Sequence, residues 1–233
     1  MPPTLILIRH AQALHNVDKN YDIHDPDLSE AGFGQLKALR ESLMNNPVAQ
    51  NAGLIITSPM RRTIQTALGS VDWLIAKGIP IVADADWQEN TAKPCDTGTP
   101  APALGREFPT IDFSTLDAVY PDKSTPAGAK YAYNKKALLA RGQSALKALY
   151  NRPEKVIVVV SHSGFLRECV SGWWYFNSDY RVFEFEEHKD DTELYALRQD
   201  PTTLANGGGL GLSFKDPVEL GGRLRQENAT SST

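Results

Sequence analysis

Short, almost wholly apolar runs recur along the chain at intervals that suggest buried strands. The four runs are Leu5–Ile8, Leu54–Thr57, Ile79–Ala83 and Val156–Val160. Unbroken aliphatic runs of this length are typical of strands at the centre of a parallel sheet, where both faces are covered. We therefore predict that these four segments are central strands of one sheet.

Segments with apolar residues at helical spacing lie between or after these runs. They are Ala31–Met44, Met60–Leu74, Ala129–Leu149 and a stretch from about Gly164 to Trp173. The first follows Ser29, a favourable N-cap, and Pro59 precedes the second, in a position that favours a first turn. Strands that alternate with helices predict an α/β fold: a three-layer sandwich with a central, mostly parallel sheet flanked by helices.

The end of the chain follows a different pattern. Val182–Glu186 and Glu193–Leu197 alternate apolar and polar residues, which predicts a late hairpin or edge strands. From residue 199 to residue 233 the sequence is polar and rich in glycine, so we expect a loosely held tail. Its Gly207–Gly211 run follows no convincing strand and has no GK[ST], which argues against a nucleotide-binding loop.

A second irregular stretch lies inside the expected domain. Residues 93–126 are rich in Pro, Thr, Gly and Asp and show little periodicity. A connection of this length is usually a lid, a binding insertion or a disordered segment. We therefore predict a single α/β domain over residues 1–198 that carries an insertion at about 93–126.

Composition excludes several classes of protein. Of 233 residues, 41% are hydrophobic and 22% are charged, and the formal net charge of −4 gives no support for general nucleic-acid binding. No apolar run approaches the roughly 20 residues needed to span a bilayer, and the first residues lack the features of a signal peptide. Two cysteines, Cys95 and Cys169, fit a reducing compartment. We expect a cytoplasmic protein with no nucleic-acid or membrane partner, and its oligomeric state stays open.

Polar side chains follow three of the predicted strands where each strand ends. Arg9 and His10 follow the first strand, Ser58–Arg62 the second, and Ser161–Gly164 the last. Because ligands bind beyond the carboxyl ends of parallel strands, these segments would bring imidazoles and guanidiniums to one rim of the sheet. Their common position at the carboxyl ends of the strands indicates a ligand-binding site. None of the three segments would indicate such a site alone.

A purely structural role or a zinc site would account for fewer of these residues. Arg9 and His10 could simply end a strand through backbone hydrogen bonds, but that leaves the other two segments unexplained. A zinc site formed by His10, His15 and His162 has no recognised ligand spacing. His15 could line a pocket or face solvent, and its sequence context favours neither.

Four segments can be compared with known motifs: Leu7–Gln12 with Asn16, Asp27–Gly32 with Gln35, Ser58–Ala67 and Ser161–Gly164. In this order they resemble the signature segments of the histidine phosphatase superfamily, in its RHG-motif branch, which includes the phosphoglycerate mutases. The glycine of the RHG signature is Ala11 here. Trp87–Glu89 and Pro94–Gly98 are also similar to segments of fungal phosphoglycerate mutase-like proteins.

The resemblance implies a phosphoglycerate mutase-like fold and a phosphohistidine intermediate on His10, without a metal or cofactor. Neutral imidazole is nucleophilic at pH 7, because its ordinary pKa is about 6.5. Guanidiniums match phosphate oxygens, and the motif selects Arg62 rather than Arg61 as the second functional arginine. The residues expected to bind the phosphorylated substrate are Arg9, His15, Asn16, Arg62, His162 and Ser163.

An acid must protonate the leaving alcohol, and Glu89 is the expected donor. It follows the predicted strand Ile79–Ala83, where the family places its acid. Asp86 and Asp96 are the alternatives. The expected catalytic residues are therefore Arg9, His10, Arg62, Glu89 and His162.

These residues predict a metal-independent phosphomonoester hydrolase that acts on a small phosphorylated substrate. The insertion holds only Lys93, Arg106 and Lys123 as basic residues, unlike the insertion with which cofactor-dependent mutases grip a bisphosphate. A phosphoglycerate mutase-type phosphotransferase and a non-catalytic phosphate-binding protein are the alternative functions.

Overall fold

The computed structural model describes residues 1–187 and 194–224 of the chain. This part contains a seven-stranded sheet in the order β3-β2-β4-β1-β5-β6, with β7 paired to β5. The strands are β1 (Thr4–Arg9), β2 (Ala52–Thr57), β3 (Ile81–Ala83), β4 (Val156–Ser161), β5 (Asp179–Phe185), β6 (Leu197–Gln199) and β7 (Gly208–Gly209). Strands β1 to β4 run parallel, whereas β5 pairs antiparallel with β1, β6 and β7. The predicted α/β sandwich is confirmed.

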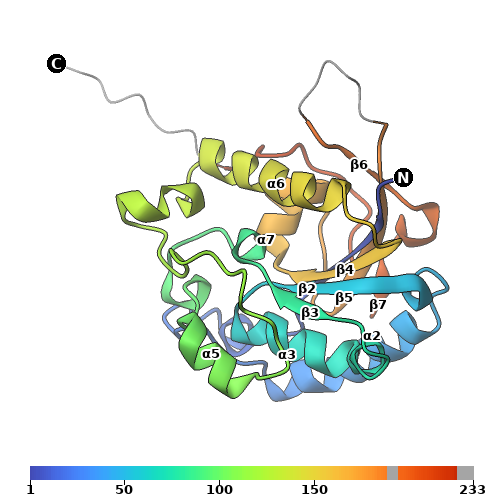
Figure 1. Cartoon of the computed structure of the whole chain (residues 1–233), viewed down its shortest axis with the longest axis horizontal. Helices are drawn as coiled ribbons and strands as arrows, with labels where there is room; N and C mark the ends of the chain where they lie inside the picture. Colours follow the sequence, from blue (N-terminus) through green and yellow to red (C-terminus); the bar gives the residue numbers. More distant parts are fainter. Residues whose placement is uncertain (188–193, 225–233) are drawn as a thin grey trace.

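Helices cover both faces of this sheet (Figure 1). They are α1 (Leu14–Val17), α2 (Glu30–Met44), α3 (Arg61–Ser70), α4 (Asp72–Ile75), α5 (Ala101–Glu107), α6 (Lys135–Tyr150) and α7 (Ser163–Phe165), which continues as the π-helix η5 (Leu166–Ser171). Short 3-10 turns are η1 (Ala49–Asn51), η2 (Ala85–Trp87), η3 (Pro94–Asp96), η4 (Pro126–Tyr131) and η6 (Pro201–Thr203). Within the described residues, no helix is long and apolar enough to cross a membrane.

The central strands bury side chains on both faces, which explains their unbroken apolar sequence. Ile6 and Ile8 of β1 join an apolar cluster with residues of α2 and α3. Leu5 and Leu7 point to the opposite face, where the cluster includes Leu146 of α6. Burial of alternate side chains on opposite faces holds β1 at the centre of the sandwich.

Two expected helices are interrupted. The segment Met60–Leu74 forms α3 and α4, and Val71 separates them. The segment Ala129–Leu149 begins as the 3-10 turn η4, and α6 starts afresh after Asn134, whose side chain accepts a hydrogen bond from the Ala137 amide at 2.8 Å. A local cap of this kind restarts the helix in a new direction, which apolar spacing alone does not reveal.

The helix expected from Gly164 to Trp173 is also irregular. It begins as α7, continues as the π-helix η5 and stops before Gly172, which has a positive φ of 70°. Glycine adopts this left-handed conformation without a steric penalty, so the helix ends at Ser171, two residues before the predicted end.

The segment after Gln199 is tied to the sheet over its described part, although the sequence predicts a loosely held tail. Strand β7 pairs with the beginning of β5. The carboxylate of Asp179 accepts hydrogen bonds from the backbone of Gly211 and Leu212, both at 2.8 Å, and from the Ser213 hydroxyl at 2.7 Å. Strand β5 has an antiparallel neighbour, as predicted, but this strand, β6, begins at Leu197, the last residue of the expected segment Glu193–Leu197, and Glu193 lies outside the described residues.

Candidate active site

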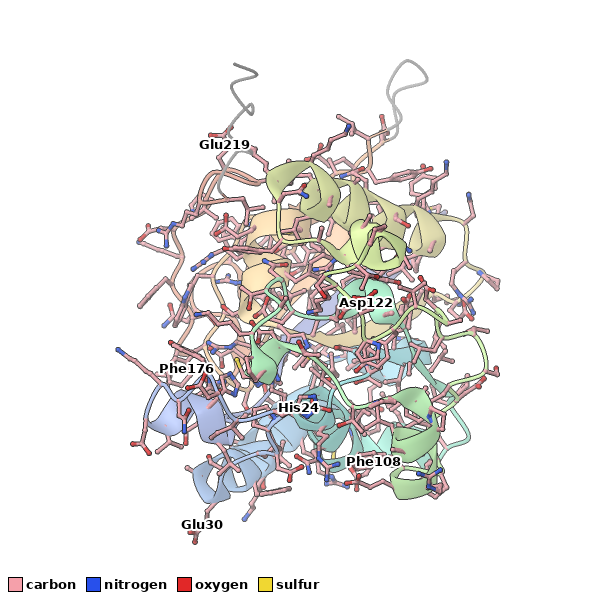
Figure 2. All side chains as sticks on the ribbon, turned by 90° about the vertical axis from the view of Figure 1, so that its left-hand side faces the viewer. His24, Glu30, Phe108, Asp122, Phe176 and Glu219 are labelled. Atoms are coloured by element: carbon pink, nitrogen blue, oxygen red, sulfur yellow. The ribbon has the colours of Figure 1, made fainter. Side chains whose placement is uncertain are left out.

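The sheet order brings the expected site residues to one edge. Strands β1 and β4 are parallel neighbours with Arg9 opposite Ser161, so the next residues, His10 and His162, lie beside each other. Their ring centroids are 5.2 Å apart. Strand β2 lies on the other side of β4 and leads into α3, which carries Arg62. Figure 2 views the molecule from the side at which these strands end.

One ring nitrogen of His10 is available for chemistry. Its Nδ1 lies 2.7 Å from the carbonyl oxygen of Ala11, which can only accept, so Nδ1 carries the proton. The lone pair of Nε2 then accepts a hydrogen bond from Nε of Arg62 at 3.3 Å. Burial lowers the pKa of His10 well below 6.5, and the charges of Arg62 and Arg9 lower it further. The imidazole is therefore neutral at pH 7, as a nucleophile must be.

Two guanidiniums supply positive charge beside this nitrogen. Arg62 is buried and donates to the carbonyl oxygen of Cys95 at 2.6 Å and to the carboxylate of Asp96 at 3.2 Å. Arg9 donates to the carbonyl oxygen of Tyr175 at 2.9 Å. Burial lowers the pKa of Arg9 to about 10, which leaves it charged at neutral pH.

The second histidine is held by a serine from the neighbouring strand end. Nε2 of His162 lies 2.9 Å from Oγ of Ser58, and Nδ1 is buried without a hydrogen-bond partner in residues 1–187 and 194–224. Burial lowers the pKa of His162 well below 6.5, with a further contribution from Arg62. Ser163 is the first residue of α7, directly after this histidine.

His15 and Asn16 lie on the other side of His10. The rings of His15 and His10 are 6.0 Å apart, and the Asn16 amide donates to Nε2 of His15 at 2.9 Å. Burial lowers the pKa of His15 to about 4. The sequence left open whether His15 lines a pocket or faces solvent, and in the structure it lines the pocket.

Glu89 is held entirely by backbone amides. Its Oε1 accepts from the amides of Asn90 at 2.9 Å and Phe165 at 3.0 Å, and its Oε2 accepts from Gly164 at 3.2 Å. Burial raises the pKa of Glu89, and the neighbouring charge of Asp96 adds to the rise. The carboxyl group therefore keeps its proton to a higher pH than an ordinary glutamate.

The two alternative acids lie in different places. Asp86 pairs with Lys130 at 2.6 Å and accepts from the Ser144 hydroxyl at 3.0 Å, so it faces η4 and α6. Asp96 lines the same cavity as Glu89. Only Asp96, of the two alternatives, shares the pocket with His10.

The pocket around these groups has a volume of about 280 Å³. It is lined by Arg9, His10, His15, Asn16, Tyr21, Glu89, Thr91, Lys93, Cys95 and Asp96. At its wall, the ammonium group of Lys93 lies 4.4 Å from the ring centroid of Tyr21. A pocket of this size and polarity suits a small charged molecule rather than a large apolar one.

The sequence did not single out Lys123, which comes from the insertion and is buried beneath the pocket. Its ammonium group donates to the carbonyl oxygens of Glu89 at 2.7 Å, Thr91 at 3.0 Å and Asp96 at 2.5 Å. Burial lowers its pKa to about 7. Lys123 thus fastens the whole segment from Glu89 to Asp96, which carries the acid and the carboxylate partner of Arg62.

The structure supports neither a cysteine nucleophile nor a metal site in the described residues. Burial raises the pKa of the Cys95 thiol to about 12, so this cysteine is not a thiolate near pH 7. In the described residues, no group of three or more His, Cys, Asp or Glu side chains is arranged to hold a metal ion.

Comparison with known proteins places the chain among phosphate-processing enzymes. The model of the histidine phosphatase superfamily (branch 1) matches residues 5–203. A phosphoglycerate mutase-like protein 1 of Arabidopsis thaliana is 30% identical over 197 residues, which cover 70% of this chain and 69% of the relative. A probable phosphatase of Schizosaccharomyces pombe is 30% identical over 164 residues, which cover 68% of this chain and 73% of the relative.

Solved structures show the same fold at lower identity. A putative alpha-ribazole-5'-P phosphatase from Escherichia coli matches with a TM-score of 0.55 and 16% identity, covering 84% of this chain and 96% of that one. A phosphoserine phosphatase from Entamoeba histolytica matches with a TM-score of 0.53 and 18% identity, covering 90% and 99%. These likenesses concern the arrangement of the backbone.

Replacing Lys123 by Met should destabilise the protein, because buried carbonyl oxygens would lose their donor. We expect the free energy of unfolding to fall by about 3 kcal/mol, measured by urea denaturation. Lys136→Met, at an exposed position of α6, is the matched control and should change it by less than about 0.5 kcal/mol. Equal stabilities of the two variants would contradict the fastening role of Lys123.

Proposed function

Since the chain belongs to the histidine phosphatase superfamily, we propose that it is a phosphomonoesterase that works through a phosphohistidine on His10. The family and the names of the relatives support a phosphatase or mutase-type enzyme. One contact carries the finer proposal: the Ala11 carbonyl fixes the proton on Nδ1 of His10, so Nε2 keeps its lone pair and accepts a hydrogen bond from Nε of Arg62. No metal ion takes part in the steps that follow.

In the first step, the lone pair on Nε2 of His10 attacks phosphorus, and the bond from phosphorus to the ester oxygen breaks. The electron pair of that bond stays on the leaving oxygen, which takes the proton of Glu89. Arg9 and Arg62 hold the phosphoryl oxygens, on which negative charge lies throughout the transfer. Asn16 lines the same pocket, and His162, whose Nδ1 has no partner within residues 1–187 and 194–224, lies beside His10 with the ring centroids 5.2 Å apart.

In the second step, water attacks phosphorus and gives its proton to the carboxylate of Glu89. The bond from nitrogen to phosphorus breaks, and its electron pair returns to Nε2 of His10. Inorganic phosphate leaves, and Glu89 is protonated again for the next cycle.

The insertion supports hydrolysis over transfer of the phosphoryl group to a second alcohol. A mutase that works through a bisphosphate needs cationic side chains for the second phosphate. Lys123 is occupied by three carbonyl oxygens, and Lys93 is the basic residue of the insertion that lines the pocket. Of the basic residues of the insertion, Lys93 alone is therefore placed to meet a second phosphate in the pocket that holds His10.

Replacing His10 by Ala should abolish hydrolysis of p-nitrophenyl phosphate, with a loss of roughly 10³-fold or more in kcat, because the nucleophile is gone. Rapid acid-free quenching of the wild-type enzyme should trap an acid-labile phosphoryl group, located at His10 by mass spectrometry. His24→Ala is the matched control, since His24 is exposed (labelled in Figure 2) and should retain activity.

Three results would contradict this mechanism. A protein that binds phosphate but turns over no ester would be a binding protein. Transfer of the phosphoryl group to a second alcohol, without release of inorganic phosphate, would indicate a mutase. Loss of activity with EDTA, restored by a divalent ion, would contradict the metal-free phosphohistidine route.

The shifted pKa values predict a bell-shaped pH profile for esters of ordinary alcohols, limited by His10 at low pH and by Glu89 at high pH. Activity falls at low pH when His10 becomes protonated, and the lowered pKa of His10 moves this limb well below pH 6.5. It falls at high pH when Glu89 loses its proton, and the raised pKa of Glu89 moves this limb above pH 4.5. Glu89→Gln should remove the alkaline limb of kcat/KM for ethyl phosphate and lower kcat by about 10²- to 10⁴-fold.

The same variant should lose less kcat/KM towards p-nitrophenyl phosphate, because nitrophenolate leaves without a proton in the first step. If the fall of kcat/KM at high pH persists unchanged in Glu89→Gln, a group other than Glu89 causes it. Asp96→Asn is then the variant to compare, since Asp96 lines the same pocket.

Replacing Gly164 by Ala should displace the acid, because a Cβ there would lie 2.5 Å from Oε1 of Glu89. We expect kcat/KM for ethyl phosphate, which reports the cleavage of the ester, to fall by about 10²-fold, and kcat/KM for p-nitrophenyl phosphate to fall less. Gly34→Ala on α2 is the control, because a Cβ there meets no atom within 4 Å. Equal losses for both esters would contradict the role of Glu89 as the acid.

A further inference from the structure

A second cavity, of about 200 Å³, adjoins the pocket that holds His10. The two cavities share Glu89, Thr91 and Asp96 in their walls. The remaining residues of the second cavity are Asn90, Tyr133, Gly164, Arg167, Glu168, Arg223 and Leu224. Glu89 thus stands where the two cavities meet.

The position of Glu89 defines the direction in which a substrate extends. In the proposed hydrolysis, the phosphorus lies between Nε2 of His10 and the leaving oxygen, and Glu89 protonates that oxygen. In-line displacement places the alcohol on the side of phosphorus opposite His10. The alcohol therefore lies beside Glu89, and the second cavity has this same carboxyl group in its wall but not His10.

The carboxylates of the second cavity already have hydrogen-bond donors. Asp96 accepts from Arg62 at 3.2 Å and from the Thr91 hydroxyl at 2.6 Å. Glu168 accepts from Nε of Arg167 at 2.7 Å and from the backbone amide of Arg223 at 3.3 Å. Glu89 accepts from three backbone amides. These carboxylates are therefore neutralised or held in place before any ligand arrives.

The guanidinium of Arg223 differs from these groups. Arg223 is exposed and lines the cavity, and within residues 1–187 and 194–224 no carboxylate forms an ion pair with it. Its backbone is anchored by Glu168, which fixes the start of the side chain at the cavity wall. In Figure 2, Glu219 marks the C-terminal segment that carries Arg223, and Asp122 marks the end of the insertion next to Lys123.

We propose that the second cavity is the leaving-group subsite, and that Arg223 selects phosphate esters whose alcohol carries an anionic group close to the ester oxygen. A guanidinium pairs with a carboxylate or a second phosphate through two parallel hydrogen bonds. The proposal rests on the hydrolysis at His10 described above, and it deepens that function by naming the class of alcohol.

The test gives the full-length protein two esters that differ mainly in charge: phosphoglycolate, with a carboxylate, and ethyl phosphate, with a methyl group in its place. We expect the wild-type protein to show a kcat/KM at least tenfold higher for phosphoglycolate. Arg223→Met should bring the ratio of the two kcat/KM values close to one, mainly through KM for phosphoglycolate. The expected change is about ten- to hundredfold, the range of a charge-assisted hydrogen bond.

Arg223→Lys should keep part of the preference, because it keeps the charge and loses the two-pronged geometry. Arg198→Met is the matched control, since Arg198 is an exposed arginine of β6 that pairs with Glu184. The bisphosphate of ethylene glycol distinguishes the two anions: a preference for it over phosphoglycolate would assign the subsite to a second phosphate.

A wild-type ratio near one, or a ratio unchanged in Arg223→Met, would overturn the proposal. Calorimetric binding of both esters to His10→Ala separates this failure from failure of the enzyme function. Binding that prefers phosphoglycolate in a protein without turnover would support the subsite and contradict hydrolysis. Hydrolysis of both esters without preference would support the enzyme and contradict the subsite.

Discussion

The parallel pairing of β1 with β4 is the contact on which the site depends. Their register sets Arg9 opposite Ser161, so His10 and His162 leave the sheet side by side. A slip of one residue would turn every side chain of a strand to the other face. Ile6 and Ile8 pack into one apolar cluster, and Leu5 and Leu7 pack into the other. A slip of one residue would exchange these side chains between the clusters, so that their shapes would no longer fit their neighbours on either face. Core packing therefore holds the two imidazoles in place.

The site concentrates positive charge while keeping its imidazoles neutral. Arg9, Arg62 and Lys123 donate largely to carbonyl oxygens, of Tyr175, Cys95 and the segment from Glu89 to Asp96. Carbonyl dipoles compensate part of the desolvation cost of a buried cation without adding a full negative charge. Asp96 is the exception, since it engages Arg62 directly. The positive charge of Arg9 and Arg62 suits a phosphate dianion and opposes protonation of His10.

The sequence was sufficient for the features that depend on apolar pattern and on side-chain identity. It predicted the central strands. It also predicted that Arg9, His10, Arg62 and His162 lie at one edge of the sheet, because the carboxyl ends of parallel strands meet there. It could not predict Lys123, whose three partners are main-chain carbonyls that every residue possesses. Nor did it reveal the contacts of Asp179 with the segment after Gln199, because these partners are backbone amides and a single serine.

The way Glu89 is held has a consequence for how this part of the protein can change during evolution. Its donors are the amides of Asn90, Gly164 and Phe165, and any residue except proline supplies an amide. The hydrogen bonds to the acid therefore do not depend on which side chains stand at 90 and 165, whereas Gly164 is restricted by its missing Cβ. Other contacts restrict the first two positions, because Phe165 is packed in the core and the Asn90 side chain accepts a hydrogen bond from Arg141. A carboxyl group held by backbone amides is difficult to recognise from the sequence, because its partners require no particular side chain, even though its position in the structure is fixed.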